Sequence, residues 1–222
     1  MKTLFKNNSA LYLITDRTIS SLPLRKMVRQ AITAGIRTIQ IREKNLSKKE
    51  LFTEIQLVIP LFLKYNVTFI INDYVDIALA ADADGVHLGQ EDMPVKEARR
   101  ILGRDKIIGI STHNLEQALE AERAGADYIG FGPVFKTLTK DAGRPKGIDA
   151  LREIRKHIRI PVVAIGGIAP ENASLALEAG ADAVAVISGI LSGNIKTNVK
   201  KFLTSIKTVY SPRKIKCSPL LG

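Results

Sequence analysis

The stretch EAGADAV at residues 178–184 ends a helical pattern on a glycine and begins a run of small and branched apolar residues. Two other stretches repeat this arrangement, RAGADYI at residues 123–129 and TAGIRTI at residues 33–39. A glycine at the end of a helix adopts the left-handed conformation that other residues adopt only at a cost. The same helix-to-strand turn used three times predicts a chain built from repeated units of one strand and one helix.

Eight short β-like runs alternate with helical stretches along the chain. Most runs are nearly continuous valine, isoleucine and leucine, which is typical of parallel strands buried on both faces. They cover residues 11–15, 38–42, 68–72, 85–89, 107–111, 128–132, 162–166 and 183–188. Eight units predict an α/β fold, a single (β/α)8 TIM barrel, because the alternative, an open doubly wound sheet, usually has fewer strands. We expect the barrel to span residues 1–209, followed by a basic, flexible tail at 210–222.

The composition is typical of a soluble protein with a large core. Of the 222 residues, 45% are hydrophobic, yet no apolar run approaches the ~20 residues of a membrane span. The first residues lack the apolar core of a signal peptide. The single cysteine, Cys217, cannot form an internal disulfide and is expected to be inert. We therefore expect a cytoplasmic protein.

Positive charge is concentrated near the C-terminal end. The formal net charge is +11, and after Asp182 the chain contains seven basic residues and no acidic one. Such a segment can contact nucleic acid or a membrane surface, but only one aromatic residue, Tyr210, is interleaved with the basic residues. We therefore favour a solvated last helix and tail with no nucleic-acid or membrane partner. The sequence leaves a homo-oligomer open.

In barrels of this kind the chemistry lies on the loops that follow the strands. The second run ends in QIREK at residues 40–44, where Gln40 and Arg42 point the same way and Lys44 lies just beyond them. Two cations at a strand end indicate an anion-binding site. The alternative is a salt bridge to Glu43 or Glu91.

Two carboxylates, Asp73 and Asp92, follow the third and fourth runs and are expected on adjacent loops. Neighbouring carboxylates repel each other unless a cation or a proton intervenes. A few oxygen ligands, with no cluster of cysteine or histidine, indicate Mg²⁺ that completes its coordination with water and phosphate oxygens. The alternative is that Asp73 caps the helix that starts near Val75. His87, in the fourth run, is interpreted as a buried structural histidine.

Further candidate anion-binding groups follow the later runs. Ser111 ends the fifth run, where it either donates to an anion or caps the next helix. The longest loop, at residues 132–147, contains Thr137, Thr139 and Lys140, which make a candidate phosphate clamp that closes over substrate. Small residues, GG at 166–167 and SG at 188–189, follow the last two runs, where backbone N–H groups form the common phosphate site of such barrels. Two anion sites indicate one bisphosphate substrate or two phosphorylated substrates.

Five motifs resemble, in order, those of the thiamine phosphate synthase family. They are QIREK at 40–44, IND at 71–73, GVHLGQED at 85–92, GPVFKTLTK at 132–140 and GGI at 166–168. The resemblance covers residues 11–188. It implies a transferase that joins 4-amino-5-hydroxymethyl-2-methylpyrimidine diphosphate to a thiazole phosphate and releases pyrophosphate. The thiazole would be hydroxyethylthiazole phosphate or its carboxylated form.

The resemblance also implies a role for each candidate residue. The pyrimidine diphosphate would be held by Gln40, Arg42, Lys44, Asn72 and Lys140. Asp73 and Asp92 would hold Mg²⁺ on the diphosphate, with Ser111 nearby. The thiazole phosphate would be held by Thr137, Thr139, Gly167, Ile187 and Ser188. The residues counted as catalytic are Arg42, Lys44, Lys140 and Ser111.

The implied reaction is a Mg²⁺-assisted, dissociative loss of pyrophosphate. It requires no protein nucleophile, which fits the absence of a Ser-His-Asp or Cys-His set. One alternative is the related thiazole tautomerase, whose family lacks the diphosphate and metal residues present here. Another is a phosphosugar isomerase or aldolase barrel, in which Lys44 would form a Schiff base. A third is a non-catalytic phosphate-binding barrel that senses thiamine phosphate.

Overall fold

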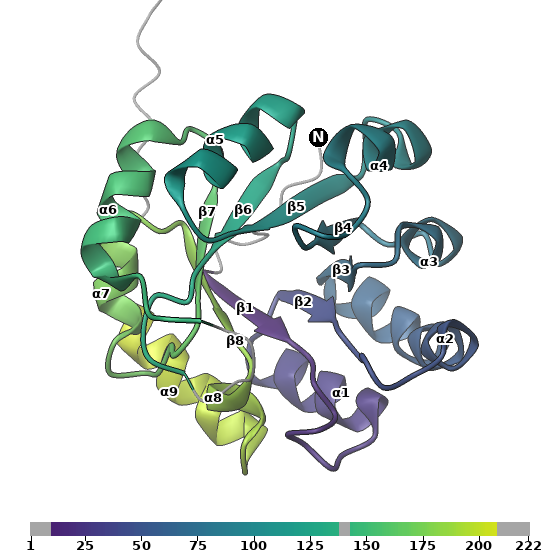
Figure 1. The fold of residues 1–222 in the computed structure, drawn as a ribbon. Coiled ribbons are helices and arrows are strands. Elements are labelled where there is room, and N and C mark those ends of the chain that lie inside the picture. The colour runs from purple at the N-terminus through teal and green to yellow at the C-terminus, as the bar shows by residue number, and fades with distance from the viewer. Residues whose placement is uncertain (1–9, 138–142, 208–222) are drawn as a thin grey trace, which may run out of the picture.

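The computed structural model describes residues 10–137 and 143–207 and contains a closed barrel of eight parallel strands. Each strand pairs with the next along the chain, and β1 also pairs with β8 (Figure 1). The strands are β1 (Leu11–Ile14), β2 (Thr38–Ile41), β3 (Thr68–Asn72), β4 (Gly85–Leu88), β5 (Ile107–Thr112), β6 (Tyr128–Phe131), β7 (Val162–Ile165) and β8 (Ala183–Val186). The predicted TIM barrel is therefore confirmed, and the open sheet is excluded.

Helices follow the strands and form an outer ring around the barrel. They are α1 (Leu24–Ala34), α2 (Lys48–Tyr65), α3 (Val75–Ala80), α4 (Val95–Leu102), α5 (Leu115–Ala124), α6 (Gly147–His157), α7 (Ala173–Glu178), α8 (Ser188–Leu191) and α9 (Ile195–Lys207). The short α8 directly follows β8, and α9 packs beside α1, so the last helix completes the ring (Figure 1).

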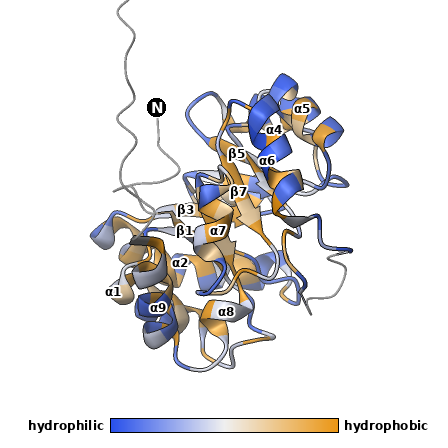
Figure 2. Ribbon diagram, turned by 90° about the vertical axis from the view of Figure 1, so that its left-hand side faces the viewer, coloured by the Kyte–Doolittle hydropathy of each residue, from blue (hydrophilic) through white to orange (hydrophobic). Residues whose placement is uncertain are grey.

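The helices turn their apolar residues toward the barrel. In α4, for example, the buried residues are Val95, Ala98 and Leu102, whose spacing places them on one face of the helix. The strands are apolar and the outer helix faces are mostly polar (Figure 2). In the described part of the chain, no helix combines the length and apolar composition needed to cross a membrane.

The repeated glycine turn has the predicted geometry. Gly35, Gly125 and Gly180 have φ angles of 122°, 90° and 105°. A side chain at Gly180 would also collide with Arg155, because an added Cβ would lie 2.5 Å from its Cγ. These glycines let each helix turn back into the next strand without strain.

Aspartates brace the amino-terminal end of the barrel, on the face opposite the predicted site. Each one directly precedes an even-numbered strand, and its carboxylate accepts a hydrogen bond from a backbone N–H of the preceding strand. The bonds are Phe69 N to Asp84 (2.9 Å), Ile108 N to Asp127 (2.7 Å) and Val162 N to Asp182 (2.8 Å). Asp127 and Asp182 also pair with Arg99 and Arg155. These contacts lie at the end of the barrel opposite the predicted site, so they stabilise the fold and not the site.

Candidate active site

A cavity of about 490 Å³ opens at the carboxyl ends of the strands, a volume suited to small-molecule ligands. Every predicted site residue that the structure describes lines this cavity: Gln40, Arg42, Lys44, Asn72, Asp73, Asp92, Ser111, Thr137, Gly167, Ile187 and Ser188. The other two predicted residues, Thr139 and Lys140, lie outside the described residues, as do Cys217 and the tail at 210–222. Residues predicted from separate loops thus meet at one place.

The end of β2 directs two cations toward the cavity. Arg42 pairs with Asp16 at 3.2 Å, not with Glu43 or Glu91, so the salt-bridge alternative named the wrong partners. Glu43 instead turns inward: it is only 6% exposed, its Oε2 accepts from Arg17 N at 3.2 Å, and burial raises its pKa. Glu43 thus points into the protein, while Arg42 and Lys44 on either side of it line the cavity.

Asp73 and Asp92 form a close carboxylate pair. The pKa of Asp73 is raised to about 6, first because burial disfavours its charge and then because Asp92 lies within hydrogen-bonding contact. Lys44 and Arg42 lower the same pKa, so both cations lie near enough to act on it. A half-buried carboxyl pair of this kind favours either a shared proton or a bound cation.

The backbone holds Asp73 at the strand end rather than at a helix cap. Its φ is +63°, and its N–H donates to His87 O at 2.8 Å, which fixes it beside β4. The residue at the start of α3 is Tyr74, which has no side-chain cap hydrogen bond. The alternative in which Asp73 caps the helix is therefore wrong.

The carboxylate pair suits a hard divalent cation that is also held by a phosphorylated ligand. Asp92 accepts a hydrogen bond from Gly89 N at 2.6 Å, which orients one of its oxygens. The described residues contain no group of three or more His, Cys, Asp or Glu side chains that could hold a metal ion. Mg²⁺ commonly uses only one or two carboxylates and takes its other ligands from water and phosphate. The residues present fit such an ion, for which Asp73 and Asp92 would be the protein ligands.

Ser111 belongs to the cavity and not to a helix cap. Strand β5 continues through Thr112, and α5 is capped by Asn114, whose side chain accepts from Gln117 N at 2.9 Å. Ser111 Oγ lies 2.9 Å from His87 Nε2. The helix-cap alternative for Ser111 is therefore wrong.

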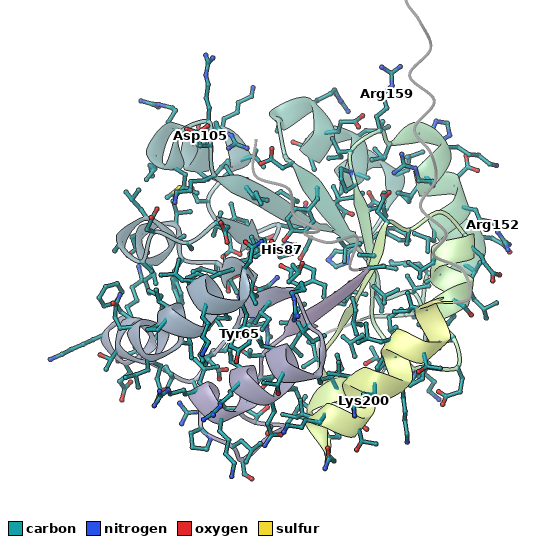
Figure 3. The ribbon with its side chains drawn as sticks, turned by 180° about the vertical axis from the view of Figure 1, so that it is seen from behind. Tyr65, His87, Asp105, Arg152, Arg159 and Lys200 are labelled. Carbon is teal, nitrogen blue, oxygen red and sulfur yellow. The ribbon has the colours of Figure 1, made fainter. Side chains whose placement is uncertain are left out.

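Three buried polar residues were not functional candidates from the sequence: His87, which lines the cavity, and Tyr12 and Tyr128, which do not. His87 lies near the centre of the barrel, whereas Asp105, Arg152, Arg159 and Lys200 lie around its periphery (Figure 3). Its Nδ1 lies 2.8 Å from Tyr128 Oη, and burial lowers its pKa to about 4, so it is neutral at pH 7. The available signal was one histidine and two tyrosines within otherwise aliphatic strands, where polar groups need partners.

The loop after β7 lies close to the loops after β6 and β8, since an added Cβ at Gly189 would lie 3.1 Å from Ile168 O. Gly166 and Gly167 have φ angles of 92° and 65°, and an added Cβ at Gly167 would lie 2.4 Å from Lys136 O. Ile187 and Ser188 lead into α8, whose first backbone N–H groups have no partner within the helix. Gly167, Ile187 and Ser188 line the cavity, at the position where barrels of this kind commonly bind phosphate through backbone N–H groups.

The sixth loop is fastened at both of its described ends. Phe135 N donates to Gly166 O at 2.9 Å, and Gly147 N donates to Val134 O at 3.1 Å. These bonds place Thr137 at the cavity beside the glycines after β7. The predicted closing segment, which contains Thr139 and Lys140, falls in residues 138–142, outside the described residues.

Comparisons with known proteins give a consistent result. The family model described as thiamine monophosphate synthase matches residues 11–190. The chain is 50% identical over 201 residues to a thiamine-phosphate synthase of Clostridium novyi, covering 90% of this chain and 98% of that one. It is 46% identical over 201 residues to a thiamine-phosphate synthase of Chloroflexus aurantiacus, covering 90% and 93%. A solved thiamine phosphate pyrophosphorylase from Pyrococcus furiosus matches with a TM-score of 0.84 at 42% identity, covering 91% and 98%.

Proposed function

Because this chain belongs to the thiamine monophosphate synthase family, we propose that it is a transferase that makes thiamine phosphate. It would join 4-amino-5-hydroxymethyl-2-methylpyrimidine diphosphate to a thiazole phosphate and release pyrophosphate. One observation carries the proposal: a single cavity contains both a cation-flanked carboxylate pair and a set of glycine-rich backbone donors. Two phosphorylated rings would require two such anion sites.

The residues on β2 to β4 would bind the diphosphate. Asp73 and Asp92 would hold Mg²⁺, which when bound would neutralise charge on the departing pyrophosphate. Arg42 and Lys44 would stabilise the same charge more strongly as the C–O bond breaks than before it. A unit charge pair at 4 Å with an effective dielectric near 20 is worth roughly 4 kcal/mol, or about three decades in rate as an upper bound.

Other residues at the cavity would bind and orient the substrates. Gln40 and Asn72 would contact the pyrimidine diphosphate, and Lys140 would approach it from the sixth loop. The thiazole phosphate would lie against Thr137, Thr139, Gly167, Ile187 and Ser188. Holding both rings in one cavity would place the thiazole nitrogen beside the electron-poor methylene carbon as pyrophosphate leaves. The chemistry would then need no protein nucleophile.

The test is direct reconstitution with purified protein. Mg²⁺, the pyrimidine diphosphate and hydroxyethylthiazole phosphate are mixed, and thiamine phosphate and pyrophosphate are measured. Stoichiometric formation of both products supports the proposal, whereas tight binding of both substrates without product would identify a non-catalytic barrel. A parallel reaction with the carboxylated thiazole phosphate would establish which form is used. Loss of product on chelating Mg²⁺, restored by adding it back, would support the metal assignment.

A further inference from the structure

A chain of hydrogen bonds crosses the interior of the barrel and ends at the cavity. Gln40 Nε2 donates to Tyr12 Oη at 3.0 Å, and the hydroxyls of Tyr12 and Tyr128 lie 3.0 Å apart. Tyr128 Oη lies 2.8 Å from His87 Nδ1, and His87 Nε2 lies 2.9 Å from Ser111 Oγ. We call these five residues the relay. They come from β1, β2, β4, β5 and β6, so the relay connects strands that are distant around the barrel.

Two glycines make room for the relay. Gly109 on β5 is in register with both His87 on β4 and Tyr128 on β6. An added Cβ at Gly109 would lie 2.1 Å from the Tyr128 ring, so only glycine lets the two rings meet across β5. An added Cβ at Gly130 would lie 3.2 Å from His87 Cε1, which is also tight. The strand sequences are therefore shaped around the contacts of His87 and Tyr128.

Proton counting gives the relay a direction. Burial raises the pKa values of Tyr12 and Tyr128, so each phenol keeps its single proton, and both rings are nearly inaccessible to solvent. Tyr12 accepts from Gln40, so its own proton goes to Tyr128. Tyr128 then donates to His87 Nδ1, because each buried hydroxyl needs an acceptor.

The last step concerns His87 and Ser111. A neutral imidazole has one donor and one acceptor nitrogen, so His87 accepting at Nδ1 carries its proton on Nε2 and donates to Ser111 Oγ. Within the part of the chain that the structure describes, His87 is the only side chain bonded to that oxygen. The Ser111 hydroxyl proton is then left to point into the cavity, which Ser111 lines.

We propose that the relay makes Ser111 a hydrogen-bond donor to the substrate, with His87 and Tyr128 as positioning residues that act through it. The proposal rests on the proposed function, because a donor at this place matters to turnover only if the cavity binds the substrates. The matching ligand group is an acceptor, such as an unprotonated ring nitrogen or a phosphate oxygen. If the relay ran the other way, His87 would carry its proton on Nδ1 and Ser111 would donate to His87 instead.

The direction can be tested without any substrate. The chain contains three histidines, so the double variant H113Q/H157Q, made without a histidine tag, leaves His87 as its only imidazole. Nitrogen-15 NMR at pH 7 distinguishes a protonated from an unprotonated ring nitrogen. We expect the proton on Nε2 and none on Nδ1. A proton on Nδ1, or two protonated nitrogens, would overturn the proposal.

The functional role can be tested by a double-mutant cycle. Tyr128→Phe removes the donor to His87, and we expect kcat/KM for the pyrimidine diphosphate to fall roughly fivefold or more, the scale of one hydrogen bond. In a Ser111→Ala background the same change should have almost no further effect, because the relay acts through Ser111. An undiminished effect in that background would refute the role. Tyr65→Phe, on the outer helix α2, is the matched control and should leave kcat/KM unchanged.

The two tests separate failure of the inference from failure of the proposed function. If the parent protein makes no thiamine phosphate, the proposed function fails while the NMR result still decides the direction of the relay. If Tyr128→Phe does not fold, His87→Leu removes the next member of the relay and should give the same loss that depends on Ser111. A loss with His87→Leu that persists without Ser111 would also count against the inference.

Discussion

Replacing His87 with glutamine should remove a specific part of the protein's response to acid. His87 is buried between Tyr128 and Ser111, and burial lowers its pKa from an ordinary 6.5 to about 4. Below pH 6.5 the unfolded chain therefore binds a proton that the folded chain does not. The free energy of unfolding must fall as the pH is lowered from 6.5 toward 4.

The size of the effect follows from the two pKa values. One pKa unit corresponds to about 1.4 kcal/mol, and at pH 5 the unfolded imidazole is almost fully protonated while the folded one is mostly neutral. His87 should therefore account for a loss of about 2 kcal/mol between pH 7 and pH 5. Asp73, whose pKa is raised to about 6, acts in the opposite direction over part of this range. It is present in both proteins, so it cancels in their difference.

The assay is urea unfolding of the parent protein and His87→Gln at pH 7, 6 and 5. We expect the parent to lose about 2 kcal/mol more than the variant between pH 7 and pH 5. His157→Gln, on the exposed end of α6, controls for removing a histidine and should follow the parent. Equal pH slopes for the parent and His87→Gln would show that the buried imidazole is not held neutral, and the reasoning would fail.

Three further predictions concern the cavity and the opposite end of the barrel. Asp92→Ala should lower turnover in Mg²⁺ by roughly a hundredfold or more with little change in thermal unfolding; steady-state activity like that of the parent would contradict the metal assignment. Lys140→Ala should slow the chemical step in single-turnover experiments without weakening thiazole-phosphate binding, and equal single-turnover rates would refute this role; Lys136→Ala, an exposed lysine of the same loop, is the control. Asp127→Ala removes the acceptor for Ile108 N and the partner of Arg99, so it should lower the free energy of unfolding by about 1–3 kcal/mol without changing kcat. The exposed Asp105→Ala is its control, and a similar loss in both variants would argue against the brace.

Much of the fold and of the site could be predicted because both depend on features local in sequence. The strands are apolar runs separated by glycine turns, and each predicted run overlaps an observed strand. The residues after these runs had to converge, since parallel strands in a barrel end at the same mouth. That is why Asp73 and Asp92, nineteen residues apart along the chain, could be paired before their positions were known.

The parts that could not be predicted depend on exact register and on contacts across the barrel. Arg42 pairs with Asp16 because β1 and β2 are neighbours in register, which the local pattern around Glu43 does not indicate. Ser111 was a possible helix cap in the sequence, but the observed cap is Asn114, because β5 extends through Thr112. A hydrophobic pattern does not define the end of a strand to a single residue.

The relay could not be predicted from the sequence for a related reason. Tyr12 and Tyr128 are 116 residues apart, and their hydroxyls meet only because the barrel is closed. The need for glycine at position 109 can be recognised only when it is known that His87 and Tyr128 flank it on the neighbouring strands. His87 was therefore interpreted as structural, which is correct for its burial but omits its contact with Ser111.

The braces at the amino-terminal mouth have a practical consequence for protein engineering. Three of the four even-numbered strands are preceded by an aspartate that holds the neighbouring strand. The exception is β2, which is preceded by Arg37, whose guanidinium donates to the carbonyl of Ile32 in α1 and to that of the adjacent Ile36. The start of β2 is thus held by a different kind of contact from the starts of β4, β6 and β8. Substitutions at the amino-terminal end of the barrel could therefore change the unfolding temperature of the enzyme without altering the residues at the carboxyl ends of its strands.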